Sequence, residues 1–108
     1  MKHKPADIAL CSVVKAELLY GALHSAKPES NTALLEQLFA PLKSFAFDDL
    51  TAKHYADIRE SLSKQGKLIG ANDLLIAAIA RANQLTLVTH NTVEFERVEG
   101  LKLTDWEI

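Results

Sequence analysis

The sequence is poor in the features that mark secreted and membrane-spanning proteins. Cys11 is the only cysteine among 108 residues, so no disulfide can form within the chain. No apolar run reaches the roughly 18 to 20 residues that cross a bilayer as a helix. Asp7 interrupts the first residues before they could form the apolar centre of a signal peptide. These absences predict a soluble, cytoplasmic protein without a membrane segment.

The sequence also lacks a large excess of positive charge and a cluster of histidine or cysteine side chains. The formal net charge is −2, which argues against a protein that grips nucleic acid with a broad basic face. It does not exclude a nuclease that holds phosphate through a bound cation. The four histidines are scattered and lack the spacing of a zinc site. Composition alone therefore indicates no function.

The chain has the length and composition of one globular domain. Its 48% hydrophobic and 24% charged residues are ordinary for such a domain, and 108 residues are enough for one hydrophobic core. No linker, repeat or low-complexity segment divides the sequence. We therefore expect a single domain over residues 1–108.

Strand-like and helix-like segments alternate along the chain. We expect short strands at residues 7–11, 45–47, 85–89 and 101–103. Helical periodicity lies between them, and the segment Asn72 to Ala82 is apolar almost all round, as in a buried helix. Alternation of this kind predicts an α/β fold with a parallel sheet flanked by helices.

Short polar side chains mark where the expected helices begin. Ser12 is the expected cap of the first helix, and one of Ser30, Asn31 or Thr32 that of the second. Asp48, Asp49 and Thr51 supply cap chemistry for a third helix that runs to about Gln65.

Three acidic residues lie where a parallel sheet would bind a ligand. Glu17 is in the second turn of the first helix, Asp73 opens the buried helix, and Glu94 follows the strand Leu85 to Thr89. Ligands of open parallel sheets bind beyond the carboxyl ends of the strands. Carboxylates that converge there would bind a hard cation such as Mg²⁺ or Mn²⁺. The spacing fits a structural interpretation equally well, with Asp73 as a helix-capping residue and Glu17 in solvent.

Four segments together resemble the PIN-domain ribonucleases of the VapC toxin type, in the order of that family. They are residues 8–21, which contain a Glu-Leu-x-x-Gly context, and residues 69–77, 87–95 and 100–106. The resemblance implies a PIN-like fold and cleavage of RNA phosphodiesters with Mg²⁺ or Mn²⁺. It also implies a VapB-type antitoxin as partner. We expect a homodimer or larger species, because a sheet without its opening strand exposes unpaired backbone edges and apolar helix surface.

The resemblance assigns roles to individual residues. It implies that Asp73, Glu17 and Glu94 bind the metal. Asn91 stands where many PIN domains have an aspartate and is the fourth candidate catalytic residue, while Thr89 would help to orient water or metal.

The opening of the family pattern has no counterpart before Pro5. PIN domains usually begin with a strand that ends in Leu-Asp-Thr-Asn, and its aspartate is a principal metal ligand. We therefore expect an N-terminally truncated PIN-like domain that binds metal weakly, cleaves RNA feebly or not at all, and associates through exposed sheet edges. The alternative is a catalytically impaired remnant that acts by dimerisation or antitoxin binding.

Overall fold

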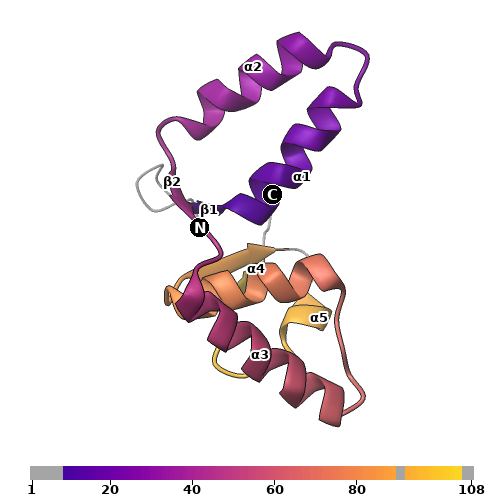
Figure 1. Cartoon of the computed structure of the whole chain (residues 1–108), viewed down its shortest axis with the longest axis vertical. Helices are drawn as coiled ribbons and strands as arrows, with labels where there is room; N and C mark the ends of the chain where they lie inside the picture. Colours follow the sequence, from indigo (N-terminus) through magenta and orange to yellow (C-terminus); the bar gives the residue numbers. More distant parts are fainter. Residues whose placement is uncertain (1–8, 90–91, 106–108) are drawn as a thin grey trace. The chain divides into compact units, whose positions relative to one another are not determined.

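The structure is a computed structural model that describes residues 9–89 and 92–105. The chain divides into two compact units, Met1–Ala46 and Phe47–Ile108, and each contains a pair of parallel strands (Figure 1). Helices separate the paired strands in both units, which confirms the prediction of a parallel α/β fold. The single-domain organisation stays a prediction. Among the described residues, no helix is long and apolar enough to cross a membrane.

The first unit contains two helices between two strands. Strand β1 (Ala9–Cys11) leads directly into α1 (Ser12–Leu23), and α2 (Pro28–Phe39) leads to β2 (Lys43–Phe45). The strands pair in parallel, with Ala9 opposite Lys43 and Cys11 opposite Phe45. Helices α1 and α2 pack against each other. The second strand lies two residues before its predicted position.

Both predicted helix caps of the first unit are wrong. Cys11 holds the cap position of α1 without a side-chain bond, and Ser12 is already helical. The Ser12 hydroxyl donates to the Phe45 main-chain oxygen at 3.5 Å. Helix α2 begins at Pro28, whose missing N–H is no loss in the first turn, so Ser30, Asn31 and Thr32 lie inside the helix.

The second unit begins with α3 (Asp49–Lys64), which starts as predicted. Asp48 is the N-cap, and its Oδ1 accepts from the Thr51 N–H at 2.9 Å and from the Thr51 hydroxyl at 2.7 Å. The helix ends in a Schellman turn, in which the Gly66 N–H binds the Ser63 oxygen and the Lys67 N–H binds the Leu62 oxygen. Gly66 has a φ of 67°, the left-handed conformation that this turn requires.

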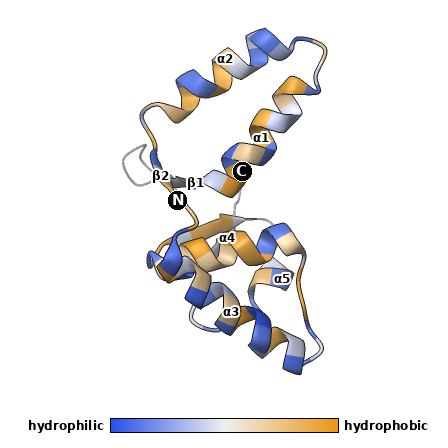
Figure 2. Ribbon diagram, viewed as in Figure 1, coloured by the Kyte–Doolittle hydropathy of each residue, from blue (hydrophilic) through white to orange (hydrophobic). Residues whose placement is uncertain are grey.

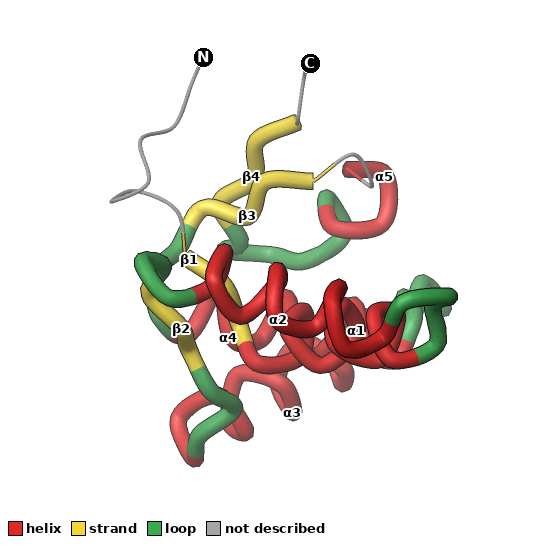
Figure 3. The backbone as a smooth tube through the Cα atoms, turned by 90° about the horizontal axis from the view of Figure 1, so that it is seen from above, coloured by secondary structure: helices red, strands yellow, loops and turns green. Residues whose placement is uncertain are grey.

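The rest of the second unit is α4 (Ala71–Ala82), β3 (Thr86–Thr89), the single turn α5 (Thr92–Phe95) and β4 (Lys102–Asp105). Strands β3 and β4 lie side by side in parallel register (Figure 3). Helix α4 is richer in hydrophobic residues than α3 (Figure 2). Its Ala77, Ala78 and Ile79 are fully buried, and Leu75 and Ile76 are half-buried, which confirms the predicted buried helix.

One hydrophobic cluster holds the second unit together. Helix α3 packs along α4, and the buried side chains come from both helices, from the loop before α4 and from the α5 region. The buried members of the cluster are Ile58, Leu62, Ile69, Leu74, Ala77, Ala78, Phe95 and Val98.

Candidate active site

Asp73 lies in the first turn of the buried helix α4. Its side chain is half-buried, and a methyl group added at Gly70 would lie 3.5 Å from its Oδ2. The positive end of the helix dipole favours a negative charge at this position. Because α4 is anchored by fully buried side chains, the backbone of Asp73 is held rigidly.

Glu94 lies in α5, directly after the carboxyl end of β3. Its side chain is half-buried, and the adjacent Phe95 is 4% exposed and anchors the turn in the hydrophobic cluster. Thr89 is the last residue of β3 and is half-buried as well. The candidate residue Asn91 falls outside the described residues.

Asp73 and Thr89 lie at the same end of the second unit. Helix α4 contacts β3, and a second Schellman turn joins them, in which the Leu85 N–H binds the Ala80 oxygen at 2.8 Å. Gln84 adopts the left-handed conformation of that turn, with a φ of 55°. The chain therefore reverses direction, so the start of α4 lies at the carboxyl end of β3 (Figure 1). Asp73 therefore lies at the carboxyl end of β3, the side of the sheet where we predicted that a ligand binds.

Glu17 belongs to the first unit, where it is an exposed residue of α1. Its convergence with Asp73 and Glu94 stays a prediction. Within residues 9–89 and 92–105, no three His, Cys, Asp or Glu side chains are grouped as a metal site. The donor chemistry nevertheless fits a hard cation, because the predicted ligands are all carboxylate oxygens.

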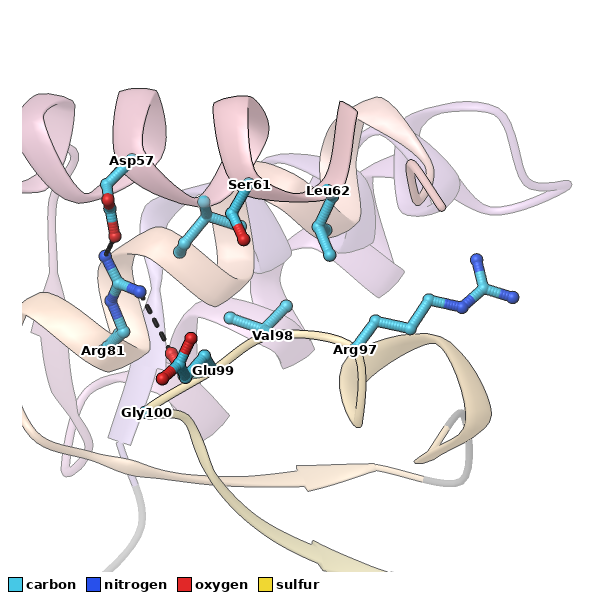
Figure 4. A pocket seen from close by; sticks show the side chains of 9 residues that line it. Asp57, Ser61, Leu62, Arg81, Arg97, Val98, Glu99 and Gly100 are labelled. Carbon is cyan, nitrogen blue, oxygen red and sulfur yellow. Dashed lines mark hydrogen bonds and ion pairs between the residues drawn. The ribbon is translucent and has the colours of Figure 1, made fainter. Parts of the chain in front are cut away.

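Arg81 is a central residue of the second unit that sequence analysis missed. Its guanidinium binds the Asp57 carboxylate and the Glu99 main-chain oxygen (Figure 4). It also donates to the His54 Nδ1. A single arginine between alanines in an apolar helix could have indicated such a role, because buried arginines are almost always paired. These contacts connect the C-terminal end of α4 to α3 and to the turn before β4.

A pocket of about 500 Å³ lies between α3 and the turn that follows α5. Ile58, Leu62 and Val98 contribute apolar lining, and Arg81 and Arg97 are among its polar residues. Figure 4 shows the Arg97 side chain extending away from Arg81. The pocket contains neither Asp73 nor Glu94, so it is separate from the candidate active site.

Comparison with known proteins identifies the family. The PIN domain family matches residues 2–101. Ribonuclease VapC2 of Haemophilus influenzae is 44% identical over 99 residues, which cover 92% of this chain and 75% of that protein. The tRNA(fMet)-specific endonuclease VapC of Shigella flexneri is 38% identical, over 98% of this chain and 89% of that protein.

A solved structure agrees with the sequence comparisons. It is the crystal structure of VapBC2 from Rickettsia felis bound to a DNA fragment from their promoter. The matching chain has a TM-score of 0.87 and 41% sequence identity, over 93% of this chain and 75% of its own length. The predicted fold and the predicted family are therefore both confirmed. This chain belongs to the PIN-domain family and, within it, to the VapC group.

Proposed function

We propose that this chain is a metal-dependent endoribonuclease of the VapC toxin type that cleaves RNA phosphodiesters. The main support is its 44% identity, over 92% of the chain, to a protein named ribonuclease VapC2. The position of Asp73 in the first turn of a buried helix, at the carboxyl end of β3, agrees with this function. We also propose that the protein acts in the cytoplasm.

We assign Asp73, Glu17 and Glu94 as ligands of Mg²⁺ or Mn²⁺. Both cations prefer oxygen ligands, and carboxylates provide them with a compensating negative charge. When bound, such a cation supplies positive charge that stabilises the charge developing on a phosphodiester. The half-buried environments of Asp73 and Glu94 strengthen electrostatic interactions relative to bulk water.

The chain's own residues hold and orient the reactants. Asp73 provides the most rigid carboxylate, because α4 fixes its backbone among fully buried side chains. Thr89, at the end of β3, and Asn91, just beyond it, offer hydroxyl and amide groups that can hydrogen-bond to water or to a phosphate oxygen. The contribution of these neutral groups is orientation of the substrate and the attacking water.

The proposal is tested by measuring RNA degradation by the purified chain with Mg²⁺, with Mn²⁺ and with EDTA. We expect the cleavage to be feeble and to require metal. The loss of cleavage rate should be largest for Asp73→Asn, followed in decreasing order by Glu17→Gln, Glu94→Gln and Asn91→Ala. The inactive Asp73→Asn protein, prepared in parallel, excludes a contaminating nuclease. RNA degradation that persists in EDTA would contradict the metal requirement.

We also propose a VapB-type antitoxin as the protein partner and a homodimer as the assembly. The support for the antitoxin comes from the similar structures, which are those of VapBC2 from Rickettsia felis, VapBC from Salmonella typhimurium and VapBC-1 from Haemophilus influenzae. Co-expression with a tagged VapB protein of such a relative should co-purify this chain. A clean monomer over a wide concentration range in light scattering would contradict the homodimer.

A further inference from the structure

Arg97 connects the two segments of the second unit that carry Asp73 and Glu94. It follows Glu94 closely, and its Nη1 donates to the main-chain oxygens of Lys67 and Leu68 at 3.4 Å each. Lys67 and Leu68 belong to the loop that leads into α4, whose first turn contains Asp73. One guanidinium therefore bridges the segment before one predicted ligand and the segment after the other.

The same two segments also meet in the hydrophobic cluster. Ile69 from the loop is 7% exposed, and Phe95 and Val98 from the other segment are each 4% exposed. These contacts hold the segments together, whereas Arg97 is exposed and adds a link on the surface. Long, exposed hydrogen bonds contribute little to the free energy of folding, so Arg97→Lys should change overall stability little.

We propose that Arg97 is a positioning residue that holds Asp73 and Glu94 in the relative placement required by a divalent cation. This inference rests on the proposed metal site. Small cations such as Mg²⁺ require ligands in a nearly fixed geometry, so a small displacement of one carboxylate weakens binding. Groups that orient metal ligands typically change metal affinity about 10- to 100-fold when they are removed. Because Arg97 acts through the main chain, we expect the lower end of that range.

Charge and geometry act in opposite directions at Arg97. Removing a positive charge from the segment that carries Glu94 favours cation binding, whereas removing the bridge disfavours it. Arg97→Lys separates the two effects, because lysine keeps the charge but is one bond shorter, so its ammonium falls short of carbonyl oxygens that Nη1 itself reaches only at 3.4 Å. A weaker affinity in Arg97→Lys therefore reports the loss of positioning alone.

The experiment is calorimetric titration of Mn²⁺ into the full chain. Arg59→Lys is the matched control, because Arg59 is also exposed and its Nη1 donates to the Tyr55 hydroxyl at 3.0 Å within α3. We expect about tenfold weaker Mn²⁺ binding for Arg97→Lys and no change for Arg59→Lys. Unchanged affinity in Arg97→Lys, while Asp73→Asn still weakens binding, would overturn this inference alone. No effect of Asp73→Asn would overturn the proposed metal site as well.

A double mutant separates positioning from a general loosening of the fold. If Arg97 acts through the carboxylates, Arg97→Lys should reduce Mn²⁺ affinity much less in an Asp73→Asn background than in the wild type. Equal losses in both backgrounds would overturn the inference. Circular dichroism at the titration temperature verifies that all of the compared proteins are folded.

Discussion

Arg81 Nη2 lies 2.7 Å from Asp57 Oδ2, and this ion pair joins α4 to α3. The two partners differ in burial, since the Arg81 side chain is 16% exposed and that of Asp57 is 70% exposed. Arg81 also donates to His54 Nδ1 at 2.9 Å and to the Glu99 oxygen at 3.0 Å. Arg81 is therefore an organising residue of the second unit, whereas Asp57 is a peripheral partner.

We expect unequal effects on stability when either partner of this ion pair is replaced. Arg81→Met should lower the free energy of unfolding by about 1 to 3 kcal/mol, because several hydrogen-bond acceptors lose their donor. Asp57→Ala should lower it by less than about 1 kcal/mol, as is typical of exposed ion pairs. Urea unfolding followed by circular dichroism measures both values. Equal losses would show that the ion pair itself, rather than the hydrogen bonds of Arg81, is important.

Replacing a leucine of the hydrophobic cluster should have a larger effect. Leu62 is 1% exposed on α3, so Leu62→Ala should lower the free energy of unfolding by about 2 to 5 kcal/mol. Leu68→Ala provides the control, because Leu68 is 48% exposed in the same unit and should change stability by no more than about 0.5 kcal/mol. Comparable losses in the two proteins would be inconsistent with the packing of α3 against α4.

The N-cap of α3 should make stability depend on pH in the acidic range. Hydrogen bonds from the Thr51 N–H, and then from its hydroxyl, lower the pKa of Asp48 below the ordinary aspartate value. The stabilisation by this carboxylate is present above the unfolded pKa of about 3.9 and is lost as the pH falls through the lower folded pKa. Asp48→Asn keeps a capping oxygen but does not titrate.

Thermal unfolding at a series of pH values tests this expectation. The Tm advantage of the wild type over Asp48→Asn should shrink as the pH is lowered from about 5 to below about 3. A difference in Tm that stays constant over this range would mean that Asp48 does not contribute through its charge.

The parts of the fold that depend on neighbouring residues could be predicted from the sequence. The start of α3 was predicted because Asp48 and Thr51 are close in the chain, and the burial of α4 because its apolar residues form one continuous segment. The cap at Ser12 was wrong because its hydroxyl binds the distant Phe45 oxygen. The start of α2 was wrong because Pro28, rather than a capping side chain, sets the first turn.

In the candidate site, too, local features could be predicted from the sequence and contacts between distant segments could not. The shared end of Asp73 and Thr89 follows from a short turn between α4 and β3, which is a local feature. The contacts of Arg81 and Arg97 could not be predicted, because their acceptors lie on segments 18 to 30 residues away. The convergence of Glu17 with these residues depends on packing between distant parts of the chain, and it stays a prediction.

The most direct test of the proposed function compares two first-turn aspartates. Asp73 lies in the first turn of α4 and Asp49 in that of α3, so asparagine at either position removes one negative charge from a helix N-terminus. The measurement is the initial rate of RNA cleavage with Mn²⁺ at equal protein concentration. We expect a low wild-type rate. Asp49→Asn should keep that rate, and Asp73→Asn should lose about 100-fold or fall to the protein-free background, the scale expected when reacting groups are misplaced. Cleavage by Asp73→Asn at the rate of Asp49→Asn would contradict a catalytic site built on Asp73.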